Sequence, residues 1–284
     1  MTTPPPVGIH YGVPAEVYHS WDALSNSQLS RLRQSPAHLL DLLEGDKDEF
    51  TSTPAQVFGT AVHCIVLEPE EYYNRYAIRP EGVSGVTKEG KAFAAQSAAE
   101  GKIVLSDEQH RWCMAVSRRV LENKRLAQWG QLDHQTEVSF VWLRDGYTCR
   151  ARADLVIPSL HIIADLKTTL TGSPEGFQRQ IAKYHYHTQG AWYTEGMREI
   201  TGEDWTFWLI AAEKRRPFLV SLYELVRGSA AHGAALNECD RLFHQYKTCC
   251  ETRTWPGYPD ATEIELPEWA LMEGATGEEE DVIL

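Results

Sequence analysis

Three strand-like runs joined by two short turns constrain this chain more than any other feature. The runs are rich in β-branched, aromatic and aliphatic residues and cover 137–142, 147–157 and 162–168. Between the first two lies Asp145-Gly146, which is typical of a two-residue hairpin turn. Such a turn pairs Arg144 with Tyr147, and counting outward from it places Glu137 opposite Asp154.

The second turn extends this register to a third strand. A four-residue loop at 158–161 would pair Ile157 with Ile162, and counting outward then places Asp154 opposite Asp165. Directly opposite residues have Cβ atoms roughly 4.5–5.5 Å apart. The sequence therefore predicts a row of three carboxylates on one face of an antiparallel sheet.

These carboxylates would repel one another without a compensating cation. Lys167 follows Asp165 by two residues, so it shares that face and lies beside Arg152 in the same register. Hard oxygen ligands with a neighbouring lysine suit Mg²⁺-assisted hydrolysis of a phosphodiester. The alternative is a row of solvent-facing salt bridges, Glu137 with Arg152 and Asp165 with Lys167. A slip of one residue would also break the row.

The rest of the chain predicts one α/β domain with helices packed on a central mixed sheet. Helical patterns cover 25–40, 55–67, 107–123, 177–198 and 229–251, and further strands cover 206–212 and 218–224. Residues 80–101 are weakly patterned, and we expect them to be partly mobile. The expected organisation is an extended N-terminal arm at 1–20, the main domain at 21–260 and a flexible acidic tail at 261–284.

Composition excludes several classes of protein. No apolar run approaches the roughly 20 residues of a membrane span, and the N-terminus lacks a signal-peptide pattern, so a cytoplasmic protein is expected. Six cysteines without C-x-x-C spacing do not predict a zinc or iron–sulfur site. The net charge is −13, but residues 254–284 hold nine acidic and no basic residues, which leaves −13 + 9 = −4 for the remainder.

A series of short motifs in a fixed order identifies a family resemblance. They read Gly-Thr-Ala-Val-His at 59–63, Arg-Ala-Asp at 152–154, Asp-Leu-Lys-Thr at 165–168 and Gln-Gly-Ala-Trp-Tyr at 189–193. The series resembles the RecB-type branch of the PD-(D/E)XK nucleases, and within it the RecE-like (exonuclease VIII) nuclease domain. The segments 24–38 and 255–258 also resemble RecE-like sequences. One departure is Ala153, which replaces the proline of the nominal motif, and the chain has no Walker A sequence.

The resemblance implies a restriction-endonuclease-like fold and a set of site residues. Lys167 takes the role of the catalytic lysine, and the implied metal ligands are Asp154, Asp165, His63 and the carbonyl of Leu166. The metal is Mg²⁺, for which Mn²⁺ should substitute. Gln189 and Tyr193 are four residues apart and share a helix face. Glu137 either holds a second metal ion or orders the site. Without the resemblance, His63 would be an ordinary helix-face histidine, and Gln189 with Tyr193 a packing pair.

The implied activity is 5′→3′ digestion of linear double-stranded DNA, which leaves 3′ single strands for recombination in phage or prophage settings. A ring of identical subunits is implied, with a tetramer favoured, and the acidic tail could dock a single-strand annealing protein. Two alternatives remain open. One is an endonuclease or single-strand nuclease of the same superfamily, and the other is a non-catalytic protein that binds DNA ends.

Two groups of polar residues are candidates for contact with DNA. The first group lies at the start of the first predicted helix, suits a 5′-phosphate and comprises Ser25, Ser27, Arg31 and Arg33. The second lies at a predicted hairpin tip and comprises Lys214, Arg215 and Arg216. Arg152, beside the carboxylates, is a further candidate. The alternatives are a plain helix cap with solvated arginines and a solvated turn.

Overall fold

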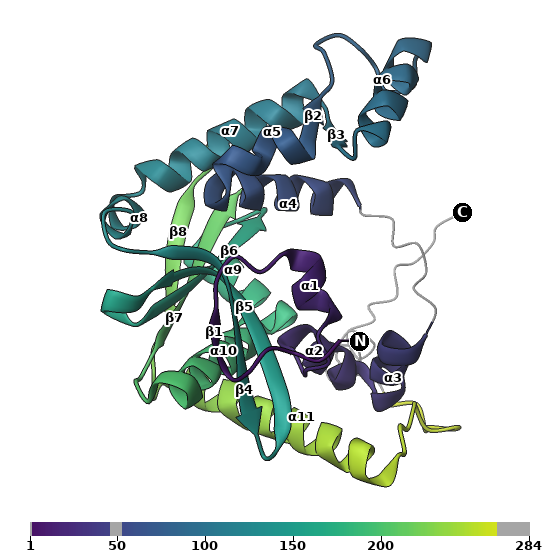
Figure 1. The fold of residues 1–284 in the computed structure, drawn as a ribbon, viewed down its shortest axis with the longest axis vertical. Coiled ribbons are helices and arrows are strands. Elements are labelled where there is room, and N and C mark those ends of the chain that lie inside the picture. The colour runs from purple at the N-terminus through teal and green to yellow at the C-terminus, as the bar shows by residue number, and fades with distance from the viewer. Residues whose placement is uncertain (1, 46–52, 266–284) are drawn as a thin grey trace, which may run out of the picture.

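A six-stranded mixed sheet forms the centre of the protein in the computed structural model, which describes residues 2–45 and 53–265 (Figure 1). All neighbouring strands are antiparallel except β6 and β7, which are parallel. The strands, in spatial order, are β1 (Gly8–His10), β4 (Gln135–Arg144), β5 (Tyr147–Ile157), β6 (Ile162–Thr169), β7 (Thr206–Glu213) and β8 (Val220–Leu225). The predicted α/β class with a central mixed sheet is confirmed.

Helices cover both faces of this sheet. Adjacent residues of β6 belong to different core clusters, Ile163 to one and Ala164 to the other, because side chains alternate along a strand. The cluster with Ile163 contains residues of α2 (Asn26–Gln34), α3 (Pro36–Glu44), α9 (Pro174–Tyr184), α10 (Tyr186–Thr201) and α11 (Ala230–Thr252). The cluster with Ala164 contains residues of α4 (Pro54–Leu67), α5 (Tyr72–Arg75), α7 (Asp107–Glu122) and α8 (Lys124–Trp129).

A smaller unit extends from the upper end of the molecule in Figure 1. It contains a two-stranded parallel sheet and one helix, β2 (Tyr76–Ile78), β3 (Ile103–Leu105) and α6 (Lys88–Ala99). Residues 80–101, whose sequence is weakly patterned, thus contain the regular helix α6, and their expected partial mobility stays a prediction. Helix α6 has an N-cap, because the Thr87 side chain accepts a hydrogen bond from the Gly90 N–H at 3.1 Å.

The predicted register is confirmed, but the predicted row of carboxylates is not a regular ladder. Arg144 pairs with Tyr147 and Ile157 with Ile162, as the turns indicated. The β4–β5 ladder skips Glu137, which has a φ of 53°. The β5–β6 ladder ends at Leu155. β5 and β6 therefore stop pairing next to Asp154 and Asp165, whereas β4 and β5 pair on both sides of Glu137.

Two helices predicted as continuous are each divided. Residues 25–40 form parts of α2 and α3, because Ser35 is extended before Pro36, as the residue before a proline prefers. Residues 177–198 form parts of α9 and α10, because His185 adopts a left-handed conformation with φ 56°. Each division gives the following helix its own direction and its own face.

The N-terminal residues expected to form an extended arm contain β1 and α1 (Ala15–Ser20). They cover the edge of β4, where Gly8 pairs with Val141. Arg150 is buried beneath them, and its guanidinium donates hydrogen bonds to the carbonyl oxygens of Tyr18 and, at 2.8 Å, Trp21. Across 2–45 and 53–265, no helix has both the length and the apolar character that spanning a bilayer requires. The predicted acidic tail lies outside the described residues from 266 onward.

Candidate active site

Asp154 lies where β5 separates from β6. Its carboxylate oxygen Oδ2 accepts a hydrogen bond from the Leu166 N–H at 2.7 Å and lies 3.4 Å from Nδ1 of His63 on α4. The side chain thus takes the place of a backbone acceptor that the interrupted ladder does not supply. Burial raises the pKa of Asp154 well above its usual value, and the nearby charge of Asp165 raises it further. A cation at this position would therefore stabilise the ionised carboxylate.

Asp165 is almost fully buried beside the catalytic lysine that the sequence predicts. Its Oδ2 accepts a hydrogen bond from Nε2 of Gln189 on α10 at 2.5 Å. Its Oδ1 forms an ion pair with the Lys167 ammonium. The structure therefore brings Asp165, Lys167 and Gln189 together from β6 and α10, as the family resemblance implied.

Lys167 keeps its positive charge in this environment. Burial alone lowers the pKa of Lys167, but the charges of Asp165 and Asp154 outweigh it and raise the pKa above its usual value. The ammonium also lies 4.9 Å from the ring centroid of Tyr186, which favours a cation. Sequence reasoning missed Tyr186, although its spacing to Gln189 and Tyr193, three and seven residues, marks one helix face.

His63 faces the same group of charges from α4. Burial lowers the pKa of His63 to about 4; the carboxylate of Asp165 opposes this shift and the charge of Lys167 adds to it. The imidazole is consequently neutral near pH 7, which is the form that binds metal ions. His63 is thus placed as the resemblance implied, rather than on an unrelated helix face.

Tyr193 is the second residue of α10 that the family resemblance assigned to the site. Its side chain is buried, which raises the pKa of the phenol well above its usual value. The neighbouring Gln189 side chain opposes this shift in the pKa, and Gln189 in turn donates a hydrogen bond to Asp165. Gln189 and Tyr193 lie four residues apart on α10 and share a helix face, as predicted.

Glu137 pairs with Arg152, as the salt-bridge alternative describes. Its Oε2 accepts a hydrogen bond from Nε of Arg152 at 2.6 Å, and Arg152 also donates to the carbonyl of Val13 at 2.7 Å. Both ion pairs of the alternative interpretation are present, Glu137 with Arg152 and Asp165 with Lys167. The second does not face solvent, however, because the Asp165 side chain is only 4% exposed.

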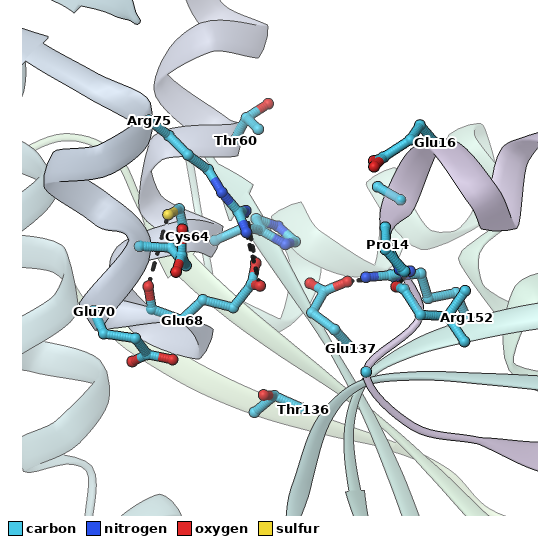
Figure 2. A pocket seen from close by; sticks show the side chains of 15 residues that line it. Pro14, Glu16, Thr60, Cys64, Glu68, Glu70, Arg75, Thr136, Glu137 and Arg152 are labelled. Carbon is cyan, nitrogen blue, oxygen red and sulfur yellow. Dashed lines mark hydrogen bonds and ion pairs between the residues drawn. The ribbon is translucent and has the colours of Figure 1, made fainter. Parts of the chain in front are cut away.

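A cavity of about 930 Å³ opens beside His63, Glu137 and Arg152, and Figure 2 shows its walls. His63 and Glu137 line it. On one side, Arg75 donates two hydrogen bonds to Glu68, at 2.7 and 2.8 Å, and on the other Arg152 holds Glu137. Further carboxylates in the wall are Glu16, Glu70 and Glu71. Sequence reasoning missed this wall, because α1, η1 (Pro69–Glu71) and α5 carry no motif that ties them to the strands.

Two of the α2 residues predicted to contact DNA, Ser25 and Arg33, instead make contacts within the protein. Ser25 is buried as the N-cap of α2, where its Oγ lies 3.4 Å from the Gln28 N–H and 3.0 Å from Ser27 Oγ. Arg33 forms an ion pair with Glu238 at 3.0 Å. The plain-cap alternative therefore describes Ser25, and Arg33 is not a solvated arginine. Arg31 and Ser27 are exposed.

The second group of predicted DNA contacts lies where expected. Lys214, Arg215 and Arg216 form the turn between β7 and β8, and both arginines are exposed. The backbone N–H of Lys214 donates a hydrogen bond to the carbonyl of Thr169 at 2.9 Å. This contact ties the turn to the end of the strand that carries Asp165 and Lys167.

The arrangement fits a divalent cation with few protein ligands. Within residues 2–45 and 53–265, no three His, Cys, Asp or Glu side chains are gathered closely enough to enclose an ion by themselves. Mg²⁺ commonly keeps several waters and takes only one or two carboxylates and a substrate phosphate. The raised pKa of Asp154 is the feature that a bound cation would reverse.

Comparison with known proteins supports the predicted superfamily. Residues 25–266 match the family described as a PDDEXK-like domain of unknown function (DUF3799). The chain belongs to this PDDEXK-like family. PD-(D/E)XK nucleases generally depend on a divalent metal ion, which agrees with the cation fit. Membership of the PD-(D/E)XK superfamily is confirmed, whereas the narrower RecE-like assignment stays a prediction.

The fold of this PDDEXK-like chain recurs among solved structures. A protein from Eubacterium rectale named as a candidate exonuclease is 16% identical with a TM-score of 0.62, over 95% of this chain and 100% of that one. A phage-related exonuclease from Haemophilus somnus is 10% identical with a TM-score of 0.37, over 82% of this chain and 96% of that one. A search of curated proteins finds no match. The first of these structures supports the fold.

Proposed function

We propose that this protein is a Mg²⁺-dependent exodeoxyribonuclease that degrades linear double-stranded DNA from the 5′ end and leaves 3′ single strands. The observation that carries the proposal is that Asp154 lies against His63 and that Asp165 contacts both Lys167 and Gln189, with His63 also lining the 930 Å³ cavity. The residues come from β5, β6, α4 and α10, and their order along the chain matches the nuclease motifs.

Each residue has a proposed role in phosphodiester hydrolysis. Asp154, Asp165, His63 and the carbonyl of Leu166 would hold Mg²⁺, with Mn²⁺ as a substitute. When bound, such an ion polarises the phosphoryl group and lowers the pKa of a coordinated water. Lys167 stabilises negative charge that develops at the reacting phosphate. Gln189 fixes the orientation of Asp165 through its 2.5 Å hydrogen bond.

The decisive experiment follows digestion of linear duplex DNA labelled at one 5′ end, with Mg²⁺ or with EDTA. We expect the label to be released by the unsubstituted protein with Mg²⁺ only, and Lys167→Ala to lower the rate by at least about 100-fold, since charge-stabilising groups contribute on this scale. The matched control is Lys183→Ala, because Lys183 also lies over a tyrosine ring, that of Tyr184, but is exposed on α9. Equal cleavage by the unsubstituted protein and Lys167→Ala would contradict the mechanism.

Covalently closed circular DNA separates the exonuclease from its alternatives. An exonuclease leaves closed circles intact and degrades them after linearisation. Cleavage of the closed circle would favour an endonuclease of the same superfamily. Binding of linear ends without metal-dependent cleavage would instead favour a DNA-end-binding protein.

The proposed assembly is a ring of identical subunits, with four favoured, that encloses its DNA in the cytoplasm. Light scattering or native mass spectrometry measures the subunit number directly. The proposed partner is an annealing protein that coats the new single strand. Deletion of residues 262–284 should weaken capture of that protein in a pull-down, and unchanged capture would exclude the tail as its docking site.

A further inference from the structure

Three arginines from two separate elements line one hollow in the surface. Arg118 and Arg119 come from the last turns of α7, and Arg216 comes from the turn between β7 and β8. The hollow has a volume of about 460 Å³, and its other lining residues are Ala115, Glu122, Pro217 and Phe218. We call these seven residues the arginine hollow.

The fold holds the two sides of the arginine hollow together. Phe218 is buried in the same core cluster as Val116 and Val120 of α7, so the β7–β8 turn is packed against that helix. The Phe218 N–H also donates a hydrogen bond to the carbonyl of Arg215 at 2.8 Å. The spacing between Arg216 and the α7 arginines is therefore set by buried packing rather than by flexible chain.

The charge of this region differs from that of the rest of the molecule. Residues 118–125 and 214–216 contain seven basic residues and one acidic residue, Glu122, in a chain with a net charge of −13. Glu122 forms ion pairs with two of these arginines. Its Oε1 lies 2.7 Å from Nε of Arg118, and its Oε2 lies 3.6 Å from Nη1 of Arg119. Arg216 has no ion-pair partner within the ranges that the structure describes. The region therefore keeps a net positive charge, whereas the walls of the 930 Å³ cavity carry many carboxylates.

We propose that the arginine hollow binds the phosphate backbone of the DNA substrate at a distance from the reacting phosphate. This inference rests on the proposed nuclease function and adds a binding site to it. Guanidinium groups match phosphate oxygens with paired hydrogen bonds, and several of them in a fixed arrangement suit a polyanion of regular spacing. The acidic cavity supplies little attraction for DNA, so a separate positive region is needed to hold it.

The position of the β7–β8 turn places the hollow within reach of the same DNA molecule. The Lys214 N–H contacts the carbonyl of Thr169, two residues after Lys167, which is about 7 Å further along β6. The turn thus begins at the end of the sheet nearest to Lys167. A duplex or single strand that leaves the active site along this end of the sheet would meet Arg216 and then α7.

The test measures the affinity of a labelled linear duplex for proteins that carry Lys167→Ala, so that binding is followed without cleavage, over a series of salt concentrations. The variant is Arg119→Gln with Arg216→Gln. We expect its affinity to fall by at least tenfold at moderate salt. The slope of log K against log salt should fall by about 1.8, since each lost phosphate contact contributes about 0.9.

The matched control removes the same charge from the opposite end of the molecule. It is Arg241→Gln with Lys247→Gln on α11, which lies far from α7 in Figure 1. We expect its affinity and salt slope to stay unchanged. A further variant, Glu122→Gln, removes the carboxylate that competes with DNA for Arg118 and Arg119, and it should raise the affinity.

Equal affinities and slopes for the two double variants would overturn the proposal. A different result would contradict the proposed nuclease function. If the protein without substitutions degrades linear DNA while the arginine variants bind it normally, only the proposed DNA binding by the arginine hollow is wrong. If that protein neither binds nor degrades linear DNA, the nuclease function is wrong.

Discussion

Asp154 shows how a single residue can favour function over stability. Its carboxylate is buried near Asp165, and both burial and that neighbouring charge raise its pKa. An acid whose pKa is raised on folding stabilises the protein below its unfolded pKa and loses that contribution as the pH rises through the folded value. Ionisation of Asp154 therefore destabilises the metal-free protein.

Removing this charge should stabilise the metal-free protein. We expect Asp154→Asn to raise the melting temperature in EDTA, whereas Asp133→Asn, at an exposed position, should leave it unchanged. Mg²⁺ at ten times its Kd should stabilise the unsubstituted protein by about 1.4 kcal/mol and Asp154→Asn much less. Thermal unfolding with and without Mg²⁺ measures both effects. Equal metal shifts in the two proteins would exclude Asp154 as a ligand.

His63 should make the metal-free protein sensitive to mild acid. Its pKa falls from 6.5 to about 4 on folding, so the unfolded chain binds more protons between these values and stability is lost as the pH drops through this window. We expect a loss of about 1–2 kcal/mol, since one pKa unit corresponds to about 1.4 kcal/mol and the ring is partly exposed.

Denaturant unfolding between pH 7 and pH 4 checks this expectation. His63→Gln should show a smaller loss than the unsubstituted protein over that range. The exposed His134→Gln should behave like the unsubstituted protein. An identical pH dependence in His63→Gln would show that His63 is not desolvated on folding.

At the scale of elements, α10 must lie very close to the sheet for Gln189 to reach Asp165. Two of its glycines allow this approach. A Cβ at Gly190 would lie 2.4 Å from Cδ1 of Phe207, and one at Gly196 would lie 2.8 Å from the ring of Trp142. Both rings are buried, so neither can move aside freely. Glycine is therefore required at these positions by packing against the strands.

Substitution of Gly190 by alanine should disturb both stability and activity. We expect Gly190→Ala to lower the free energy of unfolding by about 1–3 kcal/mol, as overpacking does, and to lower nuclease activity by displacing Gln189. Gly233→Ala on α11 is the control, because its Cβ would meet nothing within 4 Å. That change should instead stabilise the helix by about 0.5–1 kcal/mol. Equal stability of the two variants would contradict the close packing of α10.

At the scale of the whole molecule, the N-terminal segment closes one edge of the sheet and one wall of the cavity. β1 pairs with β4, and Val13 accepts a hydrogen bond from Arg152, which also holds Glu137. Residues 12–16 line the cavity directly. An uncovered edge strand tends to pair with other chains, so this segment protects the fold as well as shaping the site.

Deletion of residues 1–20 should therefore destabilise the protein and promote its aggregation. The deletion exposes the edge of β4 and removes the Tyr18 carbonyl that Arg150 contacts. Arg150→Met in the full chain removes the buried cation but keeps the edge covered, so it should not aggregate. Light scattering at increasing protein concentration distinguishes the two. A deletion variant that stays monodisperse and as stable as the full chain would contradict this role.

Much of the fold and of the site could be predicted because the informative signals are local. The Asp145-Gly146 turn sets the β4–β5 register, and the spacing between Gln189 and Tyr193 places both on one helix face. The division at Ser35 and Pro36 was also readable, since the residue before a proline disfavours a helix. The left-handed conformations of Glu137 and His185 have no comparable signal.

By itself, the sequence determined the strand register, the superfamily and the acidic, basic and polar residues available to the site. Those properties follow from turn chemistry, side-chain period and motif order, which act over short stretches of chain. Only the tertiary structure decided that Asp154 accepts the Leu166 N–H, that Glu137 pairs with Arg152 and that α5 and the N-terminal segment wall the cavity. These contacts depend on how distant elements pack and on where a ladder is interrupted, and long-range packing is not encoded in any local pattern.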